Sequence, residues 1–164
     1  MMGMKRVLLL GASGQLGSLV KNTVPDSVHL KALSRVELDI TDSLAVTQVV
    51  QEYAPTVIIN TAAYTQVDKA EVEEKQAFAV NATAVDHLTA SALPGTKIIH
   101  LSTDFVFSEL QKQPYKPDEV PLPVSVYGRS KLAGESALLE ADNVHSIILR
   151  SSWLYSATGR NFVT

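Results

Sequence analysis

Tyr127 and Lys131 are the two residues in this sequence whose types and spacing best suit acid–base chemistry. Residues four apart on a helix project from one face, so both side chains can act on one atom. A neighbouring ammonium stabilises a phenolate and is expected to bring the tyrosine pKa down toward the working range. The pair therefore suits proton donation to a carbonyl that a nicotinamide reduces by hydride transfer. The spacing alone is a weak indication, because such pairs occur by chance in many helices.

Three further polar residues precede this pair in the chain. Thr103 follows an expected strand, where its hydroxyl can hold a carbonyl oxygen and stabilise the charge that develops there. Asn81 lies inside an expected helix, where asparagine is unfavourable, so it could position a water or a backbone group that relays protons to Lys131. His100, in the middle of the strand before Thr103, is expected to be a packed or hydrogen-bonded core residue rather than a catalyst.

A glycine-rich turn near the N-terminus suggests which ligand accompanies these residues. The apolar run Val7–Leu10 leads directly into Gly11–Gly17, which has three glycines at intervals of three. This pattern is typical of a buried parallel strand that turns into a helix, and such a turn can hold a pyrophosphate. A dinucleotide is the expected ligand, and a strand–turn–helix without a ligand is the alternative. The expected contacts are Gly11, Ser13, Gly14, Gln15, Leu16 and Gly17.

The residues after the second expected strand, Val28–Leu33, bear on which dinucleotide binds. A site that prefers NAD usually has an acid there, whereas this sequence has Arg35. A guanidinium accepts the extra phosphate of NADP, so NADPH is favoured over NADH, although a solvated loop arginine is equally consistent. Asp39, within the brief expected strand Val36–Ile40, could accept from the adenine amino group or simply cap a turn.

The remaining hydrophobic pattern predicts strands that alternate with helices. The other strands are Val57–Asn60, Lys97–Leu101 and Ser146–Arg150, and the helices are Gln15–Thr23, Leu44–Tyr53, Asp68–Leu93 and Tyr127–Glu140. This alternation predicts an α/β fold, a Rossmann-type doubly wound parallel sheet with helices on both faces. Its ligand crevice lies at the carboxyl ends of the strands, and the proline-rich segment Phe105–Ser125 is expected to form a loop over that edge.

Length, charge and composition narrow the function classes. The 164 residues, 46% hydrophobic, suit one domain over residues 1–164. A net charge of −3 without any basic run disfavours nucleic acid and anionic membranes as partners. The absence of cysteine excludes disulfides and thiolate metal sites, and a reducing cytoplasm is the natural setting. No apolar run approaches the length of a membrane span.

By these motifs the chain resembles the extended short-chain dehydrogenase/reductases, and within them the dTDP-4-dehydrorhamnose reductase family. The resemblance covers nearly all of the chain and is specific in combination. The matching stretches are Gly11–Gly17, Asn60–Glu71, Leu101–Phe107, Tyr127–Glu135 and Arg150–Tyr155.

The resemblance implies an enzyme that reduces the 4-keto group of a dTDP-linked deoxysugar, converting dTDP-4-dehydrorhamnose to dTDP-rhamnose with NADPH or NADH. It implies Tyr127 as the proton donor with Thr103 and Lys131 as its partners. The further implied cofactor contacts are Asp39, Ile40, Ala62, Ala63, Tyr64, Tyr127 and Lys131, and the implied sugar contacts are Thr103, Asp104 and Trp153. Without the resemblance, Trp153 would be interpreted as a structural aromatic at the edge of the core.

The chain departs from this family in two respects. Family members are much longer, and their later part supplies most of the nucleotide-sugar pocket, so this chain resembles the cofactor-binding portion with the C-terminal substrate domain missing. Family members can also use magnesium at a dimer contact, but an expected carboxylate beside the glycine turn is Gln15 here. No metal is therefore expected, and a homodimer is a possible assembly.

Two other functions compete with reduction. A sugar-nucleotide dehydratase or epimerase would hold NAD tightly, and related dehydratases have Asp-Glu after the threonine, whereas Asp104 is followed by Phe105 here. A non-catalytic NADP-binding regulatory subunit, resembling the β subunit of methionine adenosyltransferase, is the second alternative. The presence of Thr103, Tyr127 and Lys131 together argues against that alternative.

Overall fold

A computed structural model of the chain describes residues 5–108 and 113–156. Over these residues it contains one sheet of five parallel strands in the order β2-β1-β3-β4-β5. The strands are β1 Lys5–Leu10, β2 Val28–Leu33, β3 Val57–Asn60, β4 Thr96–Thr103 and β5 Val144–Ser151. The order reverses between β1 and β3, which is where a doubly wound sheet binds its ligand. The predicted Rossmann-type fold is confirmed.

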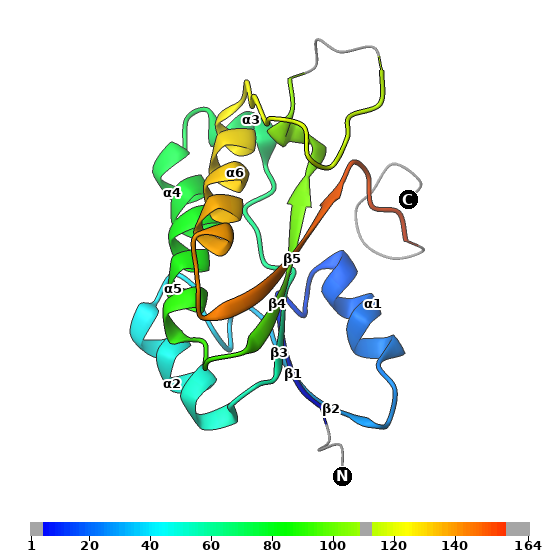
Figure 1. Ribbon diagram of the computed structural model, residues 1–164, viewed down its shortest axis with the longest axis vertical. Helices are drawn as coiled ribbons and strands as arrows, with labels where there is room; N and C mark the ends of the chain where they lie inside the picture. The colour runs from blue at the N-terminus through cyan, green and yellow to red at the C-terminus, as the bar shows by residue number, and fades with distance from the viewer. Residues whose placement is uncertain (1–4, 109–112, 157–164) are drawn as a thin grey trace.

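Helices cover both faces of the sheet. Figure 1 shows α1 on one side and α2, α4, α5 and α6 on the other. The helical elements are α1 Gln15–Thr23, α2 Ser43–Tyr53, α3 Val67–Ala70, α4 Glu74–Phe78, the π-helical turn η1 Ala79–Thr83, α5 Ala84–Ser91, the 3-10 turn η2 Asp104–Val106 and α6 Val126–Leu139. No helix in the described part of the chain has both the length and the apolar character needed to cross a membrane.

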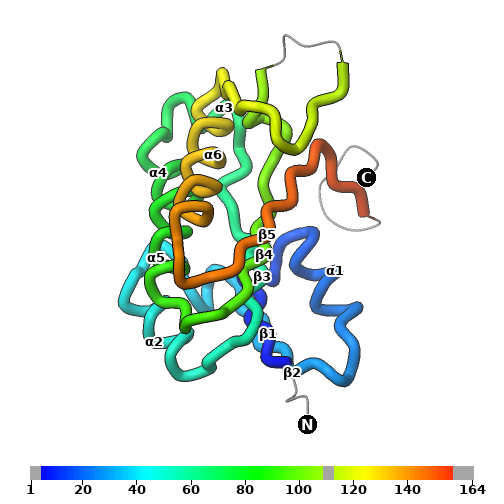
Figure 2. Tube along the Cα trace, in the orientation of Figure 1, coloured from blue at the N-terminus to red at the C-terminus, as the bar shows by residue number. Residues whose placement is uncertain are grey.

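The core lies between the sheet and the larger helical layer. Leu8 of β1, Ile58 of β3 and Ile98 of β4 are fully buried and pack with Val50 of α2 and Leu88 of α5. Central strands of a parallel sheet are covered on both faces, which explains why their sequences are continuous apolar runs. This packing fixes the carboxyl ends of β1, β3 and β4 side by side. The chain returns to the same edge between β4 and α6, as Figure 2 traces for the described part of that segment.

The strand predicted at Val36–Ile40 is absent from the structure. This segment forms a turn, in which the backbone N–H groups of Glu37 and Leu38 donate to the carbonyl of Ser34. The Glu37 carboxylate also accepts from the backbone and hydroxyl of Ser34. The hydrogen bonds of this segment close the turn, and it pairs with no strand of the sheet, so its alternating pattern does not produce a strand.

The helix predicted at Asp68–Leu93 is interrupted. It is divided into α3, α4, η1 and α5, with a turn after α3 and a π-helical turn around Asn81. The bulged backbone lies close to α6, because a Cβ atom on Gly134 would come within 2.1 Å of the Asn81 carbonyl oxygen. A π-helical turn inserts an extra residue and often marks a functional site. The segment predicted as a loop, Phe105–Ser125, is irregular apart from η2, and residues 109–112 lie outside the described residues.

Candidate active site

The glycine turn is shaped for a phosphate. Gly11 has φ +76°, and a Cβ atom there would come within 2.6 Å of the Ala62 backbone nitrogen, so glycine is required. The turn leads to α1, whose N-cap is Gly14 and whose first N–H groups receive no side-chain cap. Uncapped N–H groups at a helix start attract anions. These features fit the pyrophosphate of a dinucleotide.

A pocket of about 360 Å³ lies beside this turn. It brings together residues that follow β1, β2 and β3, as the topology predicts for the carboxyl edge of the sheet. Of the predicted cofactor contacts, Gly11, Ser13, Gly14, Arg35, Asp39, Ile40, Ala62, Ala63 and Tyr64 line this pocket.

A second pocket, of about 420 Å³, holds the residues with acid–base potential. It shares Gly14, Thr61, Ala63 and Thr65 with the first, so the two meet along the glycine turn and the segment after β3. The predicted residues that line it are Gly14, Gln15, Leu16, Gly17, Ala63, Thr103, Tyr127, Lys131 and Trp153. Asn81 and Asp104 line neither pocket.

Arg35 and Asp39 lie together at the rim of the first pocket. Their side chains form an ion pair of 3.8 Å and are 71% and 45% exposed. One oxygen of Asp39 accepts from the backbone and hydroxyl of Thr41, and these hydrogen bonds lower the pKa of the carboxyl. Asp39 therefore supports a turn and lines the pocket at once, while the guanidinium of Arg35 remains largely in solvent.

Tyr64 is held at the wall of the first pocket by a different acid. Its hydroxyl donates to Glu73 at 2.6 Å, and this bond raises the pKa of Tyr64 to about 12. The phenol is neutral at ordinary pH, so it is a hydrogen-bonding group rather than a proton source.

Asn81 joins the segment after β3 to α6. Its side chain is 1% exposed, and its Oδ1 accepts from the Tyr64 backbone N–H at 2.9 Å. Its Nδ2 donates to the Tyr64 carbonyl and to the Ser130 hydroxyl, both at 3.0 Å. All of its side-chain hydrogen bonds are to these two residues, so Asn81 holds the first pocket against the helix that carries Tyr127. A role in positioning a water or a backbone group toward Lys131 stays a prediction.

Replacing Asn81 by Ala is expected to destabilise the chain by about 2 kcal/mol, because the Tyr64 and Ser130 groups lose their buried partners. Urea unfolding would measure the change. Thr83→Ala is the control, since Thr83 is exposed in the same π-helical turn. Equal stability of the two variants would contradict a tethering role for Asn81.

Tyr127 lies in the first turn of α6 and is almost enclosed. It is 9% exposed, and its ring meets Phe105 edge-on with 5.6 Å between the centroids. Burial raises the pKa of Tyr127, a hydrogen bond with Thr103 lowers it, and the charge of Asp104 raises it. The expected lowering of this pKa by Lys131 is therefore not found. A neutral phenol is the form that can donate a proton.

Lys131 lies one helical turn further and is 1% exposed. Its Nζ donates to the Leu101 carbonyl at 2.6 Å and lies 3.2 Å from Nε2 of His100. Burial lowers the pKa of Lys131 to about 8, while the charge of Glu135 opposes this shift. His100 is 1% exposed, as expected of a core residue, and burial lowers its pKa to about 3.

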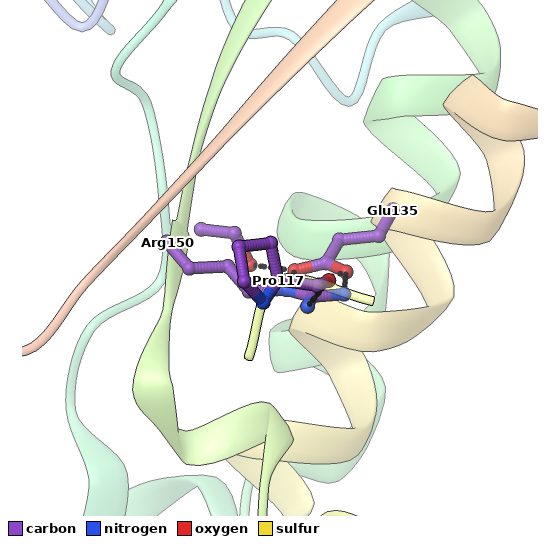
Figure 3. A network of polar contacts seen from close by, with 4 residues as sticks. Pro117, Glu135 and Arg150 are labelled. Carbon is purple, nitrogen blue, oxygen red and sulfur yellow. Dashed lines mark hydrogen bonds and ion pairs between the residues drawn. The ribbon is translucent and has the colours of Figure 1, made fainter. Parts of the chain in front are cut away.

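An ion pair that was not predicted from the sequence lies behind these residues. Figure 3 shows Arg150 of β5 against Glu135 of α6, and two guanidinium nitrogens reach the carboxylate, the shorter bond being 2.6 Å. Arg150 also donates to the Pro117 carbonyl at 3.1 Å, and Ser102 donates to the same carboxylate. Glu135 is 0% exposed. The available signal was a glutamate one turn after Lys131, on the buried face of the same helix.

Gln15, which replaces the carboxylate expected for a magnesium site, donates to the Leu154 carbonyl at 2.8 Å. Within residues 5–108 and 113–156, no group of three or more His, Cys, Asp or Glu side chains is placed to hold a metal ion. The absence of a metal remains a prediction.

Comparisons with known proteins bear on the family. The dTDP-4-dehydrorhamnose reductase of Sinorhizobium fredii is 43% identical over 96% of this chain and 53% of its own length. That of Aggregatibacter actinomycetemcomitans is 44% identical over 98% of this chain and 55% of its own length. The chain thus spans about half the length of the curated relatives it matches.

A solved structure is similar throughout the chain. The dTDP-4-dehydrorhamnose reductase of Bacillus anthracis, in complex with NADP, superposes with a TM-score of 0.93 at 38% identity, over 97% of this chain and 57% of that one. The family model described as RmlD substrate binding domain matches residues 4–164, which include the glycine turn and both pockets. The chain belongs to the RmlD substrate-binding-domain family.

Proposed function

We propose that this chain binds NADPH and carries the residues for reducing the 4-keto group of a dTDP-linked deoxysugar, as in the conversion of dTDP-4-dehydrorhamnose to dTDP-rhamnose. The observation that carries the proposal is that Thr103, Tyr127 and Lys131 line one pocket, which meets the pocket beside the glycine turn. Residues 1–164 are proposed to form one dinucleotide-binding domain.

The cofactor assignment is supported by the glycine turn, by Arg35 at the pocket rim and by the relative that was solved with NADP. The uncapped N–H groups at the start of α1 would hold the pyrophosphate. Arg35 would bind the ribose phosphate, for which a guanidinium is well suited. Bound NADPH would supply the hydride, and NADH is the alternative donor.

The proton is assigned to Tyr127. Its hydroxyl would donate to the ketone oxygen as the negative charge develops there, while Thr103 would hold the same oxygen by its hydroxyl. Lys131 follows on the same helix face and would stabilise the phenolate that remains. Asn81 would act by positioning Tyr64 and α6 rather than by contact with substrate.

The sugar contacts proposed from the family are Thr103, Asp104 and Trp153. Trp153 lines the second pocket and is 66% exposed, so its ring is accessible to a sugar. Asp104 accepts from the Thr103 hydroxyl at 3.1 Å and would act through that threonine.

Mixing the chain with NADPH and a dTDP-4-keto sugar, and following the absorbance of the reduced nicotinamide, tests the proposal. Oxidation of NADPH with formation of the 4-hydroxy sugar supports a reductase. Binding of NADPH without oxidation would favour the regulatory-subunit alternative or an incomplete enzyme. A changed sugar without net consumption of NADPH would favour an epimerase or dehydratase.

Replacing Arg35 by Asp is expected to weaken NADPH binding by about 10-fold to 100-fold relative to NADH, because a carboxylate repels the ribose phosphate. Titration calorimetry with each nucleotide would measure the ratio. Arg6→Asp is the matched control, since Arg6 is exposed on β1 and lines neither pocket. An unchanged ratio of the two dissociation constants would remove Arg35 from the cofactor site.

A further inference from the structure

Asn60 is a buried residue at the end of β3. Its Oδ1 lies 3.1 Å from the Ala62 backbone nitrogen, which can only donate, so the atom that faces Ala62 must be oxygen. Its Nδ2 therefore points the other way and lies 3.2 Å from Nδ1 of His100. The orientation of this amide is fixed by the backbone of the segment that lines the first pocket.

The amide in turn fixes the tautomer of His100. An amide nitrogen only donates, so Nδ1 of the ring must accept, and a neutral ring then carries its hydrogen on Nε2. Burial lowers the pKa of His100 to about 3, so the ring is neutral at ordinary pH. The N–H at Nε2 is directed at the Nζ of Lys131, 3.2 Å away.

The tautomer of His100 determines which protonation state of Lys131 fits this site. A donor N–H that faces Nζ needs a lone pair, which a neutral amine has and an ammonium lacks. The neutral amine still has N–H groups, one of which donates to the Leu101 carbonyl at 2.6 Å. Every contact in this chain of hydrogen bonds is therefore satisfied when Lys131 is neutral.

We propose that Asn60 and His100 form a relay that stabilises the neutral amine of Lys131 and ties its protonation to the backbone amide of Ala62 in the cofactor pocket. His100 is a positioning residue in this relay. Protonation of Lys131 moves the Nε2 hydrogen to Nζ, while Nδ1 takes up one proton from solvent. The Asn60 amide must then rotate, and the Ala62 N–H loses its acceptor.

The charges around Lys131 act against one another. On α6, Glu135 lies one turn after Lys131 and favours the ammonium, but its charge is shared with Arg150 of β5. Tyr127 lies one turn before and is neutral, and Asp104 of η2 acts on that phenol. From β4, His100 contributes no charge at ordinary pH. Burial is the largest influence on the pKa of Lys131, and the relay acts in the same direction.

The inference rests on the proposed function for its catalytic meaning. In the proposed reduction the ammonium form of Lys131 stabilises the phenolate of Tyr127, and the relay makes the proportion of this form depend on the segment after β3 that is proposed to bind the cofactor. The relay consists of hydrogen bonds within this chain and involves no ligand, so it can be tested without substrate or turnover.

The tautomer of His100 can be measured by ¹⁵N NMR on the whole 164-residue chain without ligand. His100→Asn identifies its signals among those of the four histidines. We expect the Nε2–H tautomer at alkaline pH and a change to Nδ1–H as the pH falls through the pKa of Lys131. The ¹³Cε chemical shift of Lys131 measures that pKa in the same sample. An Nδ1–H ring throughout, or a tautomer that ignores the lysine titration, would overturn the relay.

Asn60→Asp gives the second test. A carboxylate accepts from both the Ala62 N–H and Nδ1–H, so Nε2 becomes an acceptor and Lys131 is held as an ammonium. The lysine pKa is expected to rise by about one unit or more, a tenfold change in proton affinity. Asn143→Asp is the control, since Asn143 is exposed and bonds to Thr89 and Ala92 instead.

An unchanged lysine pKa in Asn60→Asp would reject the relay, and the wild-type tautomer decides the matter if that variant does not fold. A chain with the expected tautomer but no NADPH oxidation would support the relay and contradict the reductase proposal. A chain that oxidises NADPH but lacks the expected tautomer would support the reductase proposal and contradict the relay.

Discussion

Tyr127→Phe is expected to slow the proposed ketone reduction by at least about 100-fold while leaving NADPH affinity nearly unchanged. The substitution removes only the hydroxyl that bonds with Thr103. The ring keeps its edge-on contact with Phe105, so α6 should keep its place. The rate at saturating NADPH and sugar nucleotide, measured by NADPH oxidation, gives the loss.

Tyr53→Phe is the matched control for this substitution. It also removes one phenol hydroxyl, which donates to the His29 carbonyl at 2.7 Å, but Tyr53 lines neither pocket. The control should retain the wild-type rate. A Tyr127→Phe chain that reduces the sugar as fast as the control would show that the proton comes from elsewhere.

Much of the fold could be predicted because its signals are local. Val7–Leu10 is a continuous apolar run that enters a glycine turn, and the structure makes it a central, buried strand. The same turn places Gly11 and Gly14 in the first pocket. Once strands alternate with helices, residues that follow different strands meet at one edge of the sheet. That rule alone predicts that Arg35 and Ala62 lie close together, and both line the first pocket.

The two incorrect elements depended on contacts that a local pattern does not contain. The alternation at Val36–Ile40 is typical of a strand, but a strand needs a neighbour, and Ser34 and Glu37 close a turn instead. The amphipathic pattern at Asp68–Leu93 predicts one continuous helix, and the unfavourable Asn81 inside it does not show which groups it bonds to, because its partners Tyr64 and Ser130 lie elsewhere in the sequence. Tertiary contacts decided both segments.

The electrostatics of the site were the least predictable from sequence. Residues four apart were expected to pair Lys131 with Tyr127, yet Nζ contacts His100 and the Leu101 carbonyl. Burial then dominates, because it raises the pKa of the phenol and lowers that of the amine. The burial of each side chain, which residue spacing does not predict, determines whether its pKa rises or falls.

Arg150→Met is expected to destabilise the chain by about 3 kcal/mol or more, because it leaves the carboxylate of Glu135 charged and buried. In the ion pair Glu135 is fully buried and the Arg150 side chain is 21% exposed. After the substitution Ser102 remains as a donor to this carboxylate. The substitution also removes the bonds by which β5 is joined to α6 and to the Pro117 carbonyl. Urea unfolding monitored by circular dichroism would give the loss.

A double variant separates the buried charge from the lost packing. Glu135→Gln combined with Arg150→Met removes the charge itself, so it should recover a substantial part of the stability lost in Arg150→Met alone. Arg129→Met is the control, because Arg129 is exposed on the same helix α6. If the double variant were no more stable than Arg150→Met, the loss would come from the other contacts of the arginine, such as that of its guanidinium carbon, 4.9 Å from the centroid of the Phe107 ring. The ion pair with Glu135 would then contribute little to the support behind Lys131.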